Sequence, residues 1–268
     1  MTTIAQPDPP EGVAPFEEVT IPRPPGRPGV LMGHWYPAAA AAGNARGVVL
    51  LLHPWLPWGK SYFHRRGRLQ ALRAAGYGAL AVDLPGFGGS GPPSGFIDRD
   101  VEAAFAEARR RAGDLPLHVW GVSSGGYWAH FVLSQWAEVA GAMFEDVSFH
   151  LLHWSWRRIP VGRPFYLIFR YGLVKSYRYF DLRRHAPALR ARAVAYVGGE
   201  KDPGVWPEET RELARLAGGE CLIVPGADHL AAIKLANREV IELALRTFER
   251  AQKQNPAGAG LSQTGEEG

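Results

Sequence analysis

The chain has 268 residues, 46% of them hydrophobic, and a formal net charge of +4 at pH 7. This length suits one large domain, which buries roughly 75% of the surface that its unfolded chain exposes. No apolar run approaches the roughly 18 to 20 residues that cross a bilayer, and residues 1–16 lack the apolar core of a signal peptide. These features exclude a membrane-spanning protein, and we expect a cytoplasmic one.

The cysteine count limits the disulfides that the chain can form, and the charge pattern indicates which kind of partner it binds. The single cysteine, Cys221, cannot form an internal disulfide. Arginine outnumbers lysine, but the densest basic groups, at 109–111, 157–158 and 183–184, are scattered in or near predicted helices and show no aromatic stacking pattern. Solvated helix faces account for such charges, so we expect no nucleic-acid partner.

The ends of the chain, 1–15 and 254–268, are rich in Pro, Gly, Ser and Glu and are predicted to be disordered tails. Strands at 17–23 and 30–36 are predicted to pair antiparallel through a Pro-Pro-Gly turn. Strands and helices then alternate. We expect further strands at 48–52, 79–82, 117–120, 140–144, 191–197 and 220–224, with helices at 62–75, 98–112, 127–136 and after each of the last two strands.

This alternation predicts right-handed crossovers and a doubly wound, mainly parallel sheet of about eight strands with helices on both faces. One domain is expected over residues 16–253. Ligands in such α/β folds bind at the carboxyl ends of the strands.

The most informative motif is Gly121-Val122-Ser123-Ser124-Gly125-Gly126, which lies between a predicted strand and a predicted helix. A sharp turn there forces the central serine into a rare backbone conformation and exposes its side chain, while flanking glycines allow strand and helix to approach closely. The adjacent helix N-terminus favours developing negative charge. Ser123 is therefore the candidate nucleophile.

A serine nucleophile requires a base and an acid that orients the base. Asp202 follows the strand at 191–197 in a glycine-rich turn, and His229 follows the strand at 220–224. Serine, acid, histidine is the chain order of one known triad arrangement. Glu145 and Asp146, at the end of the preceding strand, are alternative acids, whereas Asp228 is interpreted as a residue that orders the histidine loop.

These motifs resemble those of the α/β-hydrolase superfamily over about residues 48–250. Two more matches support the resemblance, His53-Pro54-Trp55 after a buried strand and the D-x-x-G-x-G-x-S turn at 83–90. The resemblance implies an oxyanion hole formed by the backbone N–H groups of Trp55 and Ser124, although Pro54 replaces the glycine usual in the family. His53 is expected to order this loop.

The resemblance also implies a short lid at about 147–189, a segment rich in aromatic residues. Phe149, Trp154 and Trp156 are candidate substrate-pocket residues, and packing of the lid onto the body is the alternative for each. His150 and His153 are interpreted as lid packing residues, so no metal site is expected.

Two nucleotide-binding motifs are rejected. Residues 86–91 satisfy G-x-G-x-x-G, but prolines rather than a helix follow them. Residues 54–61 are a near miss for a phosphate-binding loop, and Pro54 and Pro57 remove two of its N–H groups. We therefore expect no cofactor.

The expected activity is hydrolysis of a small-molecule carboxylic ester through a Ser-His-Asp triad and an acyl-enzyme intermediate. Hydrolysis of a carbon–carbon bond or a thioester on the same triad is the enzymatic alternative. A catalytically inactive binding protein of this fold is the alternative from another class.

Overall fold

A computed structural model describes residues 15–39, 45–93, 97–135, 137–151 and 180–254. Within these ranges an eight-stranded sheet has the order β1-β2-β4-β3-β5-β6-β7-β8. Its strands are β1 (Glu17–Pro22), β2 (Val30–Tyr36), β3 (Gly47–Leu52), β4 (Tyr77–Val82), β5 (Leu117–Val122), β6 (Val139–Glu145), β7 (Ala191–Gly199) and β8 (Glu220–Val224).

Strand direction follows the predicted pattern. β1 pairs antiparallel with β2, and β2 pairs antiparallel with β4. All pairings from β4 through β3, β5, β6 and β7 to β8 are parallel. The predicted sheet of about eight mainly parallel strands is thereby confirmed.

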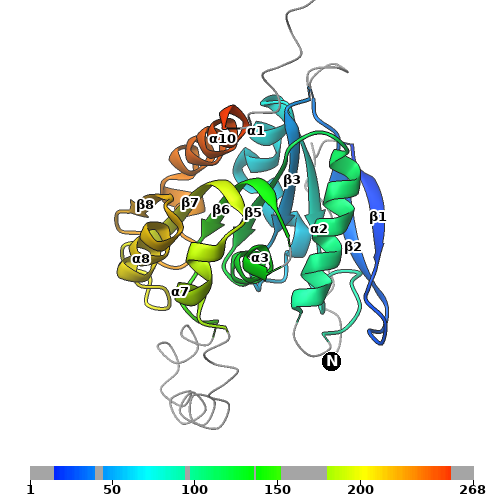
Figure 1. Cartoon of the computed structure of the whole chain (residues 1–268), viewed down its shortest axis with the longest axis horizontal. Coiled ribbons are helices and arrows are strands. Elements are labelled where there is room, and N and C mark those ends of the chain that lie inside the picture. Colours follow the sequence, from blue (N-terminus) through cyan, green and yellow to red (C-terminus); the bar gives the residue numbers. More distant parts are fainter. Residues whose placement is uncertain (1–14, 40–44, 94–96, 136, 152–179, 255–268) are drawn as a thin grey trace, which may run out of the picture.

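The described helices cover both faces of this sheet (Figure 1). They are η1 (Gly59–Gly67), α1 (Arg68–Ala74), α2 (Asp98–Ala112), α3 (Ser124–Gln135), α7 (Leu182–His185), η2 (Ala186–Ala188), α8 (Pro207–Ala217), α9 (Ala232–Leu235) and α10 (Asn237–Lys253). Neighbouring residues of one strand point to opposite faces, so Leu50 packs in the core under α2, α3 and α8, whereas Leu51 packs in the core under α1 and α10.

The prediction of one continuous helix over 62–75 is wrong. Arg65 is extended, and Arg66 and Gly67 have φ angles of +53° and +75°, so η1 ends there and α1 begins anew. Gly67 accepts this left-handed conformation at little cost. At this break the Arg65 guanidinium lies 3.6 Å from the centre of the Trp58 ring.

The order of the strands brings the predicted motifs together. β3 lies between β4 and β5, and Leu52 at the end of β3 pairs with Gly121 near the end of β5. The loop after β3 and the turn after β5 therefore lie side by side at the carboxyl edge of the sheet, where the strand order reverses. No helix in the described ranges is long and apolar enough to cross a membrane.

Candidate active site

Ser123 occupies the turn between β5 and α3 with a φ of +49°, a conformation that residues other than glycine rarely adopt. The turn is closely packed. A Cβ at Gly121 would lie 2.5 Å from the Cα of Gly126, and one at Gly125 would lie 2.4 Å from the carbonyl oxygen of Leu52. Glycines at these two positions therefore allow the strong bend at Ser123.

The three candidate triad residues lie in one hydrogen-bonded row. Ser123 Oγ is 3.1 Å from His229 Nε2, and His229 Nδ1 is 2.6 Å from Asp202 Oδ2. Because the Asp202 carboxylate only accepts, Nδ1 carries the ring proton and Nε2 is free to accept the serine proton. The structure thus brings together the three side chains that sequence reasoning selected.

The Asp202 carboxylate is held from two sides. Its Oδ1 accepts the backbone N–H groups of Gly204 at 2.7 Å and Val205 at 2.9 Å, while its Oδ2 contacts His229. The side chain is buried. Such bonds satisfy a buried carboxylate and fix its direction.

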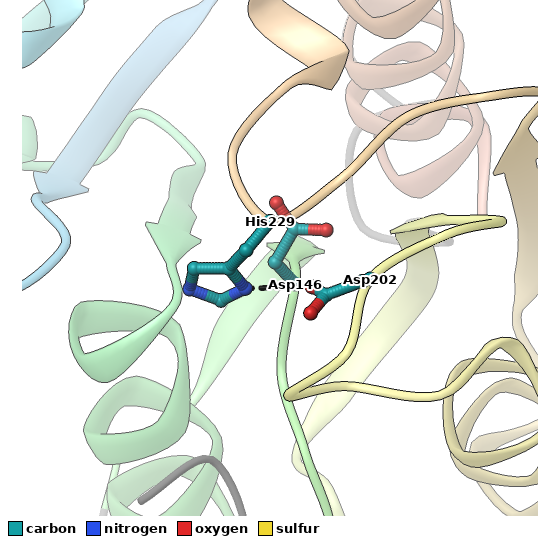
Figure 2. Close-up of side chains that lie close together, drawn as sticks. All are labelled: Asp146, Asp202 and His229. Carbon is teal, nitrogen blue, oxygen red and sulfur yellow. Dashed lines mark hydrogen bonds and ion pairs between the residues drawn. The ribbon is translucent and has the colours of Figure 1, made fainter. Parts of the chain in front are cut away.

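The loop that carries His229 is anchored at both neighbouring residues. The N–H of His229 donates to Asp228 Oδ1 at 2.6 Å, as the loop-ordering interpretation of Asp228 requires. Leu230 has a φ of +60°, and its N–H donates to Asp146 Oδ2 at 2.9 Å. Figure 2 shows Asp146, Asp202 and His229 converging from three separate loops.

The loop after β3 places Trp55 beside Ser123 and Ser124 on the wall of the same cavity. The N–H of Leu56 donates to the Pro54 carbonyl at 2.7 Å, which forms a tight turn centred on Trp55. The chain therefore turns sharply here with proline in place of glycine.

His53 orders this loop from within the core. Its Nε2 accepts the N–H of Leu84 at 2.9 Å, so Nδ1 carries the proton and donates to the Pro54 carbonyl at 2.7 Å. The ring is fully buried, and desolvation lowers its pKa. A neutral imidazole thus links the loops after β3 and β4.

Sequence reasoning missed an ion pair that fixes the same region. Lys60 Nζ lies 2.6 Å from Asp83 Oδ2, and the N–H of Lys60 donates to Asp83 Oδ1 at 2.7 Å. Both residues are buried. Asp83 directly follows β4, and Lys60 lies on η1, which follows the adjacent parallel strand β3. Two charged residues that follow neighbouring parallel strands are the signal that predicts such a pair.

A cavity of about 480 Å³ opens over the serine. Within the described residues it is lined by Pro54, Trp55, Leu56, Ser123, Ser124, Tyr127, Asp146, Ser148, Leu151, Val205, His229 and Leu230. Its size falls within the range of about 300 to 1,000 Å³ typical of small-molecule sites.

Of the predicted pocket aromatics only Phe149 lies within the described residues, and it is not among those that line the cavity. Phe149 instead packs against the hydrophobic core, with the Arg183 guanidinium 4.8 Å from the centre of its ring. Trp154 and Trp156 lie outside the described residues, as do His153 and most of the expected lid. The described parts of the lid range include α7 and η2.

The two alternative acids differ in their surroundings. Glu145 forms a bidentate pair with the buried Arg68, at 2.8 and 3.0 Å, and also accepts Trp120 Nε1–H at 2.5 Å. These donors hold its carboxylate under the sheet edge. Asp146 lies beside Asp202 and His229 in the site, and burial raises its pKa to about 7.

Asp146, Asp202 and His229 each offer an atom within 4.8 Å of the others, a spacing that a metal ion could use. Each of these side chains already has a protein partner, however. Asp146 accepts the N–H of Leu230, and Asp202 accepts the imidazole N–H of His229. The hydrogen bonds explain the grouping without a metal.

A family model described as the alpha/beta hydrolase family matches residues 49–243. The chain belongs to this family. The match spans the sheet from β3 onward and includes Ser123, Asp202 and His229. No curated protein matches the chain.

Solved structures share the fold of this alpha/beta hydrolase at low sequence identity. The Pyrococcus furiosus esterase Pf2001 is 18% identical with a TM-score of 0.68, over 94% of this chain and 98% of the esterase. A Pyrococcus horikoshii acylaminoacyl peptidase is 15% identical with a TM-score of 0.67, over 95% of this chain and 44% of the peptidase. A Mycobacterium tuberculosis puromycin-hydrolyzing peptidase is 19% identical with a TM-score of 0.67, over 88% of this chain and 39% of that protein.

Proposed function

We propose that this alpha/beta hydrolase cleaves small to medium carboxylic esters, with Ser123 as nucleophile, His229 as general base and Asp202 as the acid that orients the base. The hydrogen-bonded row from Ser123 Oγ through the imidazole to Asp202 carries the proposal, with separations of 3.1 and 2.6 Å. The row lies at the wall of a cavity large enough for such a substrate.

In the proposed reaction, Ser123 Oγ attacks the ester carbonyl while His229 Nε2 takes its proton. Asp202 holds the ring tautomer and stabilises the imidazolium that forms. The imidazolium then protonates the departing alcohol, which leaves an acyl group on Ser123. A water molecule, deprotonated by His229, releases the acid and restores the serine.

The oxyanion of the tetrahedral intermediate is proposed to accept the N–H groups of Trp55 and Ser124. Both residues line the cavity beside Ser123. Loss of one such donor costs about 3 to 4 kcal/mol of barrier in serine hydrolases. The buried contacts of His53 and Lys60 support this arrangement, because they fix the loop that carries Trp55.

Two observations favour an ester substrate. The cavity wall includes the apolar side chains of Leu56, Leu151 and Val205, which suit an acyl chain. The similarity to the Pyrococcus furiosus esterase extends over nearly the whole of both chains, whereas this chain spans less than half of the peptidases.

We also propose a cytoplasmic location, because the lone Cys221 forms no internal disulfide.

The test is hydrolysis of p-nitrophenyl esters from acetate to palmitate by the wild-type protein and Ser123→Ala. Ser134→Ala serves as a matched control, because Ser134 follows Ser123 on α3, and its hydroxyl donates to the Phe131 carbonyl and accepts from the Gln135 side chain. Activity that peaks at one chain length, survives in Ser134→Ala and is lost in Ser123→Ala is the expected result. No activity at any chain length would favour carbon–carbon or thioester hydrolysis, or a binding role.

A further inference from the structure

A second carboxylate, that of Asp146, lies in the site without a part in the proposed triad. The imidazole N–H of His229 already donates to Asp202. Asp146 is 2% exposed, and its Oδ1 has no hydrogen-bond partner among the described residues. Burying a carboxyl group with an unpaired oxygen costs free energy, which points to a role for this side chain beyond folding.

The contact that Asp146 does make is with the backbone next to His229. Its Oδ2 accepts the N–H of Leu230 at 2.9 Å, across 84 residues of sequence. Leu230 has a φ of +60°, which is strained for a leucine. The bond therefore holds the histidine loop in a conformation that the loop would not favour by itself.

The backbone around Asp146 is fixed to the other two catalytic segments. The N–H of Asp146 donates to the Val197 carbonyl on β7 at 2.8 Å, and the Glu145 carbonyl accepts the N–H of Ser123 at 2.8 Å. Asp146 itself has a φ of +51°. The end of β6 thus connects the serine turn, the strand before Asp202 and the histidine loop.

Charge at Asp146 affects the histidine as well. Burial raises the pKa of the Asp146 carboxyl, and the anions of Asp202 and Glu145 raise it further. The cationic form of His229 acts in the opposite direction and favours the ionised Asp146. Tyr62 on η1 and Arg68 on α1 also interact with Asp146 electrostatically, but Arg68 is paired with Glu145. The imidazolium of His229 is therefore the cation whose formation an ionised Asp146 assists most directly.

We propose that Asp146 is a positioning residue for His229, which fixes the histidine loop through the N–H of Leu230 and favours the imidazolium by its negative charge. This inference rests on the proposed function. The Asp146 side chain thus makes two separable contributions, a hydrogen bond to the histidine loop and a negative charge beside the imidazole.

Two substitutions separate them. Asp146→Asn keeps an oxygen that can accept the Leu230 N–H and tolerates a positive φ, but it removes the charge. Asp146→Gly removes both and suits the same φ. Glu200→Gln is the matched control, because Glu200 also accepts a backbone N–H of this loop, that of Gly226 at 2.8 Å, but is exposed.

The readout is the rate constant for inactivation by a fluorophosphonate, measured from pH 5 to 9. This probe reports activation of Ser123 without an assumption about the natural substrate. At pH 8 we expect a loss of about tenfold in Asp146→Asn and about 100-fold in Asp146→Gly. In Asp146→Asn the loss should shrink as the pH falls below about 7, because burial raises the Asp146 pKa to about 7 and the wild-type side chain is then itself neutral.

Glu200→Gln should keep both the rate and the pH profile of the wild-type protein. Wild-type rates and pH profiles in the Asp146 variants would overturn the inference. If Asp146→Gly fails to fold, the pH dependence of the loss in Asp146→Asn still decides, since a purely structural role would give the same loss at every pH. A wild-type protein that is not labelled at any pH would instead overturn the proposed function, and this inference with it.

Discussion

His229 Nδ1 lies 2.6 Å from Asp202 Oδ2, and the carboxylate is buried and held by two further N–H groups. Asp202→Asn should leave the fold intact but present an amide that can donate to Nδ1, which favours the wrong imidazole tautomer. We expect kcat to fall by about 10⁴-fold with little change in KM. Steady-state kinetics on the best p-nitrophenyl ester measure this change in kcat. A decrease in kcat of less than about tenfold would show that a residue other than Asp202 orients His229.

Arg68 and Glu145 form a buried pair, and Glu145 on β6 pairs with Val122, the residue before Ser123. Arg68→Met leaves the Glu145 carboxylate buried without its cation, and we expect a loss of about 3 to 5 kcal/mol in unfolding free energy. The double variant Arg68→Met/Glu145→Gln removes the unpaired charge and should recover much of this loss. Urea unfolding of Arg68→Met, Glu145→Gln and the double variant measures the coupling free energy between the two side chains. Losses that simply add would contradict a coupled pair.

The catalytic candidates could be predicted from sequence because each follows a parallel strand within a short turn motif. Such strand ends meet at one edge of the sheet, so Ser123, Asp202 and His229 could be brought together without knowledge of any side-chain contact. Local patterns of this kind are visible in a single sequence.

The supporting contacts could not be predicted in the same way, because they join residues far apart in the chain. Arg68 and Glu145 are separated by 77 residues, as are Arg23 and the Asp100 that it binds. The direction of Phe149 likewise depends on packing against the core and Arg183. The break at Gly67, by contrast, has a local signal in the sequence, since an internal glycine weakens a helix.

Close packing at Gly125 gives a steric prediction. In Gly125→Ala the new Cβ would lie 2.4 Å from the Leu52 carbonyl oxygen and 2.5 Å from that of His53, so backbone must move. Gly218→Ala is the control, because its Cβ meets open space and only the φ of +64° is strained. We expect a loss of about 1 to 2 kcal/mol in the control and a larger loss, with little activity, in Gly125→Ala. Equal unfolding midpoints would contradict the prediction.

The buried Asp146 predicts a dependence of stability on pH. Its pKa is raised to about 7, whereas a carboxyl in an unfolded chain ionises near pH 4. Between these values the folded protein keeps a proton that the unfolded chain releases, so its contribution to stability is fully present below about pH 4 and is lost as the pH rises to about 7.

Asparagine cannot ionise, so Asp146→Asn should escape this loss. We expect the variant to exceed the wild-type protein in unfolding free energy by on the order of 4 kcal/mol at pH 8, and the difference to shrink toward pH 4. Urea unfolding at both pH values measures it. A difference that does not change with pH would show that the carboxyl titrates normally.

The most direct test of the account is peptide mapping by mass spectrometry after reaction with a fluorophosphonate. We expect one adduct, on the peptide that contains Ser123, which is absent from Ser123→Ala and retained in Ser134→Ala. An unmodified wild-type protein, or an adduct that persists in Ser123→Ala, would contradict the assignment of Ser123 as the nucleophile.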